Sequence, residues 1–179
     1  FDGAATTDAT DAPDAFDANS LLMMGALARS CGMAGALEAM LDISVTYSQD
    51  RVAFERPISK FQAVQHNLAR LAGEVAAAVC AAASAADALQ RAGTFDDEVF
   101  FEIAAAKIRV GEAAGEGAGI AHQVHGAIGF TMEHILQRYS RRVWSWRDEF
   151  GSESAWAVRL GEAVAANGGD ELWARLAAR

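Results

Sequence analysis

The apolar residues of this chain recur at intervals of three and four in every long segment, and this spacing constrains the fold more than any other feature. Val64, Leu68, Leu71, Val75 and Val79, for example, would line one face of a helix. No segment shows the sustained alternation of apolar and polar residues that a half-buried strand requires. The sequence therefore predicts an all-α protein, an antiparallel (up-down) helical bundle with short connections and no sheet.

Capping and breaking residues give the expected helix boundaries. The expected bundle helices lie near residues 19–47, 60–90, 96–125 and 152–166, with a shorter helix at about 132–146 and a final turn or two before Arg179. Asn19 or Ser20 is the expected cap of the first helix, because both side chains can accept a backbone hydrogen bond. Gly93 should end the second helix, and Asp96 or Asp97 should begin the third.

Glycine recurs every fourth residue in the third expected helix, at Gly111, Gly115 and Gly119. Because Gly lowers helix propensity, we interpret this spacing as a place where two helix backbones approach closely. The surrounding stretch, Gly115 to His122, is followed by no Lys-Ser or Lys-Thr pair and preceded by no strand, which argues against a phosphate-binding loop.

The first 17 residues differ in composition from the rest. They contain five Asp and neither Lys nor Arg. Such a segment buries too little apolar area to offset the entropy of ordering it. We therefore expect an acidic flexible linker at residues 1–17 and one helical domain at residues 18–179. The chain begins with Phe1 rather than Met, which indicates a fragment or a processed product.

Charge and cysteine content exclude several classes of protein. A net charge of −9 argues against nucleic-acid binding, and no uninterrupted apolar run approaches the ~20 residues of a membrane span. Cys31 and Cys80 are too few for a disulfide framework, so we expect a reduced, cytoplasmic chain. The basic set Arg138, Arg141, Arg142 and Arg147 is either an anion-binding group or a solvated helix face, and both interpretations stay open.

Two pairs of ring-bearing residues are candidates for a chemical role. His122 and His125 share a helical face, but no carboxylate or thiol stands at a matching spacing, so we expect packing histidines and no metal. Trp144 and Trp146 point to different helix faces, so we expect one to pack in the bundle and the other to meet a subunit or ligand.

Two ordered segments resemble one known family. They are YSQDRVAFERPISKFQAVQHNLA (residues 47–69) and AHQVHGAIGFTMEHILQRYSRRVWSWRDEFG (residues 121–151). Together they resemble the C-terminal helical domain of flavin-dependent acyl-CoA dehydrogenases, over roughly residues 20–156. The wording HGAIGF with RRVWSWRDEFG looks most like actinobacterial members, several of which act on steroid-derived acyl-CoA side chains as two-gene heterotetramers.

The resemblance implies FAD as cofactor and a set of contacts to its ADP half. In the family these contacts reach an FAD held mainly by a neighbouring subunit. The positions that match are Arg51, Phe54, Gln123, Val124 and Ala127. Two departures stand beside them: Glu55 where Gly is usual after the Phe, and Ala127 in place of a second Gly. A carboxylate at Glu55 would oppose a pyrophosphate unless it points away.

The catalytic base is where the sequence departs most from the resemblance. Family members place a Glu either after the small-residue turn or on the first helix of this domain. The matching positions here are Phe150 and Gly25, neither of which can take a proton. Glu149, one residue away, is the remaining candidate, with Asp148 behind it. We therefore favour a subunit that lacks its own base and pairs with a chain that has one.

Three functional hypotheses follow. The first is FAD-dependent α,β-desaturation of an acyl-CoA thioester by an oligomeric acyl-CoA dehydrogenase of which this chain is a subunit or fragment. The second is a non-catalytic partner subunit that completes the FAD site and the oligomer core. The third is a helical interaction bundle without flavin. The resemblance also implies a homo- or hetero-oligomer, as a dimer of dimers, and an electron-transferring partner. The acyl group, fatty or steroid-derived, stays open.

Overall fold

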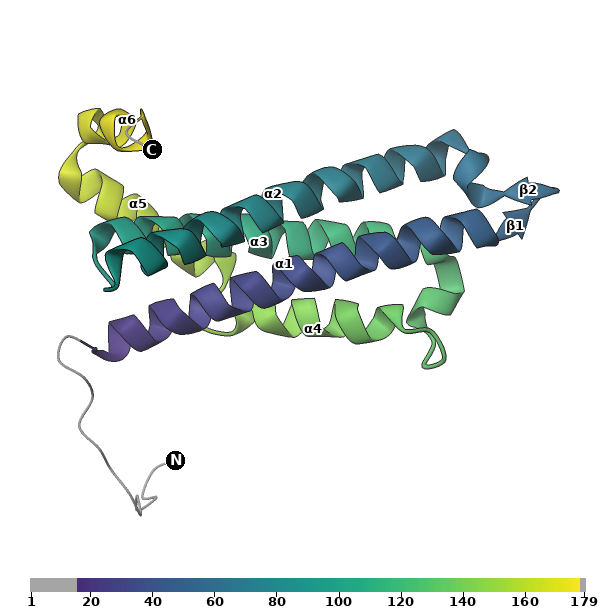
Figure 1. Cartoon of the computed structure of the whole chain (residues 1–179), viewed down its shortest axis with the longest axis horizontal. Helices are drawn as coiled ribbons and strands as arrows, with labels where there is room; N and C mark the ends of the chain where they lie inside the picture. Colours follow the sequence, from purple (N-terminus) through teal and green to yellow (C-terminus); the bar gives the residue numbers. More distant parts are fainter. Residues whose placement is uncertain (1–15, 178–179) are drawn as a thin grey trace, which may run out of the picture.

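The protein is a bundle of long helices (Figure 1). The structure, a computed structural model, describes residues 16–177. Its elements are α1 (Ala18–Asp50), β1 (Val52–Ala53), β2 (Arg56–Pro57), the short 3-10 helix η1 (Ile58–Lys60), α2 (Gln62–Ala92), α3 (Asp97–His125), the 3-10 turn η2 (Gly126–Phe130), α4 (Leu136–Asp148), α5 (Glu153–Asn167) and α6 (Gly169–Ala177). The predicted all-α bundle is confirmed.

Helix α3 is the central element, because it packs against α1, α2, α4 and α5. Two apolar clusters fill the interior. One joins Leu37, Leu71 and Val110 of the three long helices to Leu136 and Val143 of α4. The other joins residues of α1, α2 and α3 to the buried ring of Trp156 on α5. Each cluster lies under a different short helix.

The fourth wall of the bundle differs from the prediction. The sequence pattern assigned it to the helix near residues 152–166 alone. In the structure α4 lies along α1 and α3 and covers the first cluster, while α5 covers the second at the other end of α3. The fourth wall is therefore formed by two successive helices and not by one. Residues 149–152 form the corner between them.

The turn between α2 and α3 matches the prediction, whereas the cap of α1 does not, and α4 begins at Leu136 and not near residue 132. Asp96 caps α3 by accepting from the backbone N–H of Glu98 and Val99, and Gly93 ends α2 with a left-handed φ of 66°. The cap of α1 is Asp17, whose carboxylate accepts from the Ser20 N–H at 2.7 Å, and not Asn19 or Ser20. The predicted linker at residues 1–17 lies outside the described residues except for its last two.

A small hairpin corrects the expectation of no sheet. Val52 pairs with Pro57 and Ala53 with Arg56, so the two turn residues are Phe54 and Glu55. Both have positive φ, 51° and 64°, as a tight two-residue turn between twisted strands requires. Two residues per strand are too few for alternation to appear in a sequence, so the pattern could not reveal this hairpin.

The glycines of α3 also act differently from the prediction. A Cβ added at Gly117 would meet Leu37 at 2.7 Å and Leu71 at 3.1 Å, so the close helix approach occurs there. Gly111 and Gly115 instead make room for side chains from the region of α4 and α5, and Gly119 has open space around it. The regular spacing of the three predicted glycines therefore does not mark the tightest contact within the chain.

Two helices are long and apolar enough to cross a membrane by length and composition alone, which the lack of a long uninterrupted apolar run did not predict. They are α1 and α2. Half of the most apolar window of α1 is buried among the other helices, as in the core helix of a bundle.

The glycine contacts predict that an alanine substitution changes the free energy of unfolding in opposite directions at two positions of α3. Gly117→Ala should lower the free energy of unfolding by about 1–3 kcal/mol, because the new methyl group overpacks the core against two leucines. Gly119→Ala should raise it by up to about 1 kcal/mol, because Ala favours helix and meets nothing. Urea denaturation of both variants checks this, and equal effects at the two positions would contradict the packing described.

Candidate functional site

The ends of α1 and α3 are joined by one aromatic contact. The Tyr47 ring stacks on His125 with centroids 4.4 Å apart, and the Tyr47 hydroxyl donates to the His125 carbonyl oxygen at 3.3 Å. Arg51 continues directly from α1, since its N–H donates to the Tyr47 carbonyl oxygen. The hairpin after α1 and the turn after α3 therefore lie at the same end of the bundle (Figure 1).

Four of the five predicted cofactor contacts are exposed at this end. They are Arg51, Phe54, Gln123 and Ala127, which we call the cofactor surface. Among the residues that the structure describes, no hydrogen bond or ion pair engages the Arg51 or Gln123 side chain. Val124, the fifth, exposes only 7% of its surface and packs inside the bundle, so its side chain is not part of the cofactor surface.

The hairpin displays its aromatic side chain openly. Phe54 is 89% exposed at the turn, and its one described ring contact is an edge-on approach to Phe61 at 6.2 Å. The Arg56 guanidinium also lies over the Phe61 ring, 4.3 Å from its centroid. Glu55 occupies a left-handed conformation that Gly adopts without strain. This conformation gives a physical reason for the Gly expected at position 55 in the family pattern.

The turn after α3 is packed onto two buried histidines. Gly129 is buried, and a Cβ there would come within 3.1 Å of His122 Nδ1, His125 Cβ and Leu136. The Phe130 ring stacks on His122 at 4.1 Å. The small residue at position 129 therefore lets the turn that carries Ala127 close over the imidazoles, beside the last turn of α3 that carries Gln123.

Both histidines are neutral packing groups. His125 Nδ1 donates to the Ala121 carbonyl oxygen at 2.8 Å, and His122 Nε2 shares a hydrogen bond with the Ser140 hydroxyl. The remaining ring nitrogens, His122 Nδ1 and His125 Nε2, have no hydrogen-bond partner among residues 16–177. Burial lowers the pKa of each imidazole below its ordinary value. Within residues 16–177, no three His, Cys, Asp or Glu side chains gather as a metal ion would require.

The two positions where the family resemblance places a base are brought together in space. A Cβ added at Gly25 would overlap the ring of Phe150. The Phe150 ring therefore occupies the space directly over the Gly25 backbone, and no carboxylate stands at either position. An aromatic ring packed against a glycine can exclude water and a side chain, but it cannot accept a proton.

The backbone of Phe150 is held in place from both sides. It has a left-handed φ of 56°, and its carbonyl oxygen accepts from Trp156 Nε1 at 2.9 Å. Lys107 Nζ donates to the carbonyl oxygens of Arg147 at 2.6 Å and Gly151 at 2.7 Å. Burial lowers the pKa of Lys107 to about 8, which leaves the ammonium mostly charged at neutral pH. The corner between α4 and α5 is thus fixed by a fully buried cation.

Glu149, the remaining base candidate, is already engaged. Its carboxylate pairs with Arg29 Nε at 2.5 Å and accepts from the Ser145 hydroxyl at 3.2 Å. These two contacts hold the carboxylate away from any other partner. Asp148, the second candidate, ends α4 and is exposed.

An arginine-lined hollow of about 600 Å³ lies beside Glu149. Arg29 of α1 and Arg138, Arg141 and Arg142 of α4 line it, and we call it the arginine groove. Arg147, the fourth member of the predicted basic set, instead pairs with Glu153. Trp146 packs against the core, as expected of one of the two tryptophans, and Trp144 is 41% exposed and stacks over His122.

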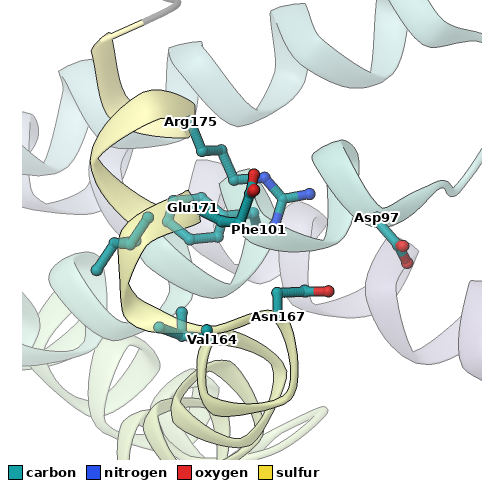
Figure 2. A pocket seen from close by; sticks show the side chains of 8 residues that line it. Asp97, Phe101, Val164, Asn167, Glu171 and Arg175 are labelled. Atoms are coloured by element: carbon teal, nitrogen blue, oxygen red, sulfur yellow. The ribbon is translucent and has the colours of Figure 1, made fainter.

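A second hollow, of about 480 Å³, lies at the end of the bundle opposite the cofactor surface, where α3 begins and α5 meets α6 (Figure 2). Figure 2 shows Arg175 reaching across it, with its guanidinium 5.2 Å from the Phe101 ring centroid. Asp97 and Glu171 add carboxylates to its rim. It contains none of the predicted site residues.

The residues that sequence reasoning missed are Lys107 and Trp156. Lys107 falls on the apolar face of α3, in line with Ile103 and Val110, and a lysine on such a face was the signal that could have revealed a buried cation. Trp156 belongs to none of the motifs that the sequence offers. Its role depends on the corner at residues 149–152, which no local pattern encodes.

Comparisons of this chain with known proteins agree on one family. Residues 17–154 match the model of the acyl-CoA dehydrogenase C-terminal domain. The chain is 35% identical over 127 residues to the acyl-CoA dehydrogenase IpdE2 of Mycolicibacterium smegmatis, covering 71% of this chain and 38% of that protein. It thus spans less than two fifths of that curated relative.

Solved structures agree. Butyryl-CoA dehydrogenase from Megasphaera elsdenii superposes with a TM-score of 0.72 at 26% identity, over 79% of this chain and 36% of that one. The ChsE4–ChsE5 complex from Mycobacterium tuberculosis gives a TM-score of 0.68 at 27% identity, over 81% of this chain and 38% of that one.

The buried histidines predict a pH-dependent stability. Because burial lowers both pKa values below the ordinary 6.5, the unfolded chain binds more protons than the folded chain as the pH falls through 6.5. The stability contributed by these neutral imidazoles is complete above pH 6.5 and is lost as the pH drops toward the folded pKa values. Urea denaturation from pH 8 to pH 5 should show this loss, and the His125→Gln variant should show less of it. His66→Gln, at an exposed position on α2, is the matched control, and an equal change there would contradict the assignment.

Proposed function

The chain belongs to the acyl-CoA dehydrogenase family, and we propose that it serves there as a C-terminal helical domain that completes the FAD site of a neighbouring subunit and supplies no catalytic base. The observation that carries the second half of this proposal is the Phe150 ring packed on Gly25. The exposed and unengaged donors of the cofactor surface support the first half.

The residues of the cofactor surface suit the ADP half of FAD. The Arg51 guanidinium can pair with a pyrophosphate oxygen through a charge-assisted hydrogen bond, and the Gln123 amide adds a neutral donor. Phe54 offers an open ring face at the end of the hairpin. Bound FAD would supply the hydride-accepting chemistry, while the residues of this chain would bind and orient one end of it. Because these side chains point out of the bundle, the FAD they meet belongs to another subunit or domain.

Desaturation of an acyl-CoA thioester requires a group that removes the α-proton. At the two expected positions this chain presents an aromatic ring and a bare backbone, so neither position can remove it. Lys107 and Trp156 fix the Phe150 backbone, which leaves the ring over Gly25. Proton removal in such an assembly therefore falls to a carboxylate of a partner chain.

The alternative is that Glu149 acts as the base within this chain. One observation favours it: Glu149 adjoins Phe150 and lines the arginine groove, where an anionic substrate could lie. Against it stand the Arg29 ion pair and the Ser145 hydrogen bond, which the carboxylate would have to leave. The two forms of the proposal differ in which chain carries the base.

The proposal implies an assembly of more than one subunit. The cofactor surface has a use only across a subunit or domain boundary, and a chain without a base needs a partner that has one. A dimer of dimers with a homologous chain, acyl-CoA as substrate and an electron-transferring partner fit this role. The named ChsE4–ChsE5 neighbour is a complex of two different chains, which makes a heteromer reasonable here. A reduced cytoplasmic setting agrees with the two free cysteines, Cys31 and Cys80.

Flavin retention tests the cofactor surface. Arg51→Ala should weaken FAD binding in the assembled complex by about 1.5–3 kcal/mol, the usual worth of a hydrogen bond to a charged group. Gln123→Ala should weaken it by about 0.5–1.5 kcal/mol, since its donor is neutral. Flavin absorbance after dialysis measures the effect, with exposed Arg91→Ala on α2 as the control. Unchanged occupancy in both variants would show that this surface does not hold FAD.

Flavin bleaching on addition of acyl-CoA tests the base. Glu149→Gln should leave the bleaching rate of the assembled complex within about threefold, because the carboxylate takes no proton. Phe150→Glu should increase the amount of flavin bleached, because it places a carboxylate where the family pattern has one. A loss of several orders of magnitude in Glu149→Gln, with flavin still bound, would make this chain the catalytic one.

A further inference from the structure

The hollow of about 480 Å³ where α3 begins and α5 meets α6, which we call the α6 hollow, shares no residue with the cofactor surface or the arginine groove. Six of its eight lining residues follow residue 154, where the match to the family model ends. The family match therefore does not extend to most of this hollow. Its volume is one that small-molecule sites commonly have, since these occupy about 300–1,000 Å³.

Arg175 is held at the α6 hollow by an aromatic ring and not by an ion pair. Its guanidinium lies over Phe101, 5.2 Å from the ring centroid. Glu171 stands four residues earlier on α6, yet among residues 16–177 no carboxylate forms an ion pair with the guanidinium. A guanidinium over an aromatic face keeps its N–H donors free, and these donors match the two oxygens of a carboxylate. Arg175 is therefore positioned to hold an anionic group.

Acceptors for a cationic group line the same hollow. Asp97 at the start of α3 and Glu171 on α6 are exposed carboxylates with no ion pair in the part of the chain that the structure describes. Asn167 donates from its amide nitrogen to the Ala163 carbonyl oxygen at 3.0 Å, so its amide oxygen remains an acceptor. Figure 2 shows Arg175 and Asn167 extending toward the side on which Asp97 lies. The rim therefore offers acceptors for an ammonium group beside a donor for a carboxylate.

The rest of the lining is mostly apolar. Phe101 is only 6% exposed, and Val164 of α5 and Leu172 of α6 lie beside it around the hollow. A ligand that is only cationic would meet the charge of Arg175, and a ligand that is only anionic would meet the two carboxylates. A ligand with both charges next to an apolar group satisfies all three features of the lining.

We propose that the α6 hollow binds a free amino acid with an apolar side chain. The carboxylate of the ligand pairs with Arg175, and its side chain lies against Phe101. Its ammonium group donates to Asn167 and to the carboxylates of Asp97 and Glu171. This site is independent of the flavin role, because the α6 hollow and the cofactor surface lie at opposite ends of the bundle.

Binding at this place should hold α6 against the bundle. Helix α6 has no buried residue and packs chiefly on α5, to which Gly168 joins it with a positive φ of 85°. A ligand that contacts α3, α5 and α6 together stabilises the docked position of α6. Amide hydrogen exchange in α6 should therefore slow when the ligand is bound.

Titration of the 179-residue chain with leucine and three analogues, followed by NMR, tests the site. The analogue 4-methylpentanoate lacks the ammonium group, 3-methylbutylamine lacks the carboxylate, and alanine lacks most of the apolar side chain. We expect leucine to bind saturably and to shift the amide signals of α6. Each analogue should bind roughly tenfold more weakly or worse, because each loses a charge-assisted contact or buried apolar area.

Two substitutions separate the contacts. Arg175→Gln should weaken binding of leucine and of 4-methylpentanoate by roughly tenfold, without weakening binding of 3-methylbutylamine. Glu171→Gln should weaken binding of leucine and of 3-methylbutylamine, without weakening binding of 4-methylpentanoate. A residue that merely supported the fold would affect all three ligands alike. Glu162→Gln, an exposed carboxylate of α5 outside the hollow, is the matched control, and circular dichroism confirms that each variant is folded.

Three results would overturn the proposal. The first is the absence of saturable leucine binding with a Kd of about 1 mM or below. The second is an analogue that binds as tightly as leucine, which would leave no role for one charge or for the apolar side chain. The third is leucine binding that Arg175→Gln leaves unchanged, or that Glu162→Gln weakens equally. Flavin retention does not enter any of these measurements, so failure of this proposal is distinguishable from failure of the cofactor surface.

Discussion

The buried ammonium of Lys107 is the interaction on which the arrangement of this domain depends. It reaches from the middle of α3 to the carbonyl oxygens where α4 ends and α5 is about to begin. A cation at the C-terminal end of a helix satisfies carbonyls that have no partner in the helix and interacts favourably with the helix dipole. Because α4 and α5 form the fourth wall in succession, this one contact decides how they meet.

The same contact determines what stands at the expected base position. With the Gly151 carbonyl held by Lys107 and the Phe150 carbonyl held by Trp156, the backbone of the corner has little freedom. A left-handed φ at Phe150, which a bulky residue rarely adopts, persists because these hydrogen bonds fix it. The ring then covers Gly25, so a side chain introduced at position 25 would have to displace the ring. The absence of a carboxylate at these two positions is therefore a feature of packing as well as of sequence.

Much of the fold could be predicted because helical periodicity and caps are local. Asp96 and Gly93 bound the turn between α2 and α3 as expected, for reasons contained within a few residues. Periodicity shows which face of a helix is buried but not which helix covers it. The division of the fourth wall between α4 and α5, and the close approach at Gly117 instead of the regularly spaced glycines, could not be read from the pattern. The hairpin at Phe54 and Glu55 is set by four paired residues, too few for a periodic signal.

The candidate site, like the fold, could be predicted from the sequence only in part. Counting along the chain locates Phe150 and Gly25 as positions without a carboxylate, but only the structure shows that one fills the space above the other. The most direct measurement of the central claim is exchange of the α-protons of an acyl-CoA into D₂O in the flavin-loaded complex, followed by NMR. If this chain has no base, the exchange rate will be the same with Glu149→Gln as with the unaltered chain. Exchange that disappears in Glu149→Gln, with the complex intact, would contradict the account.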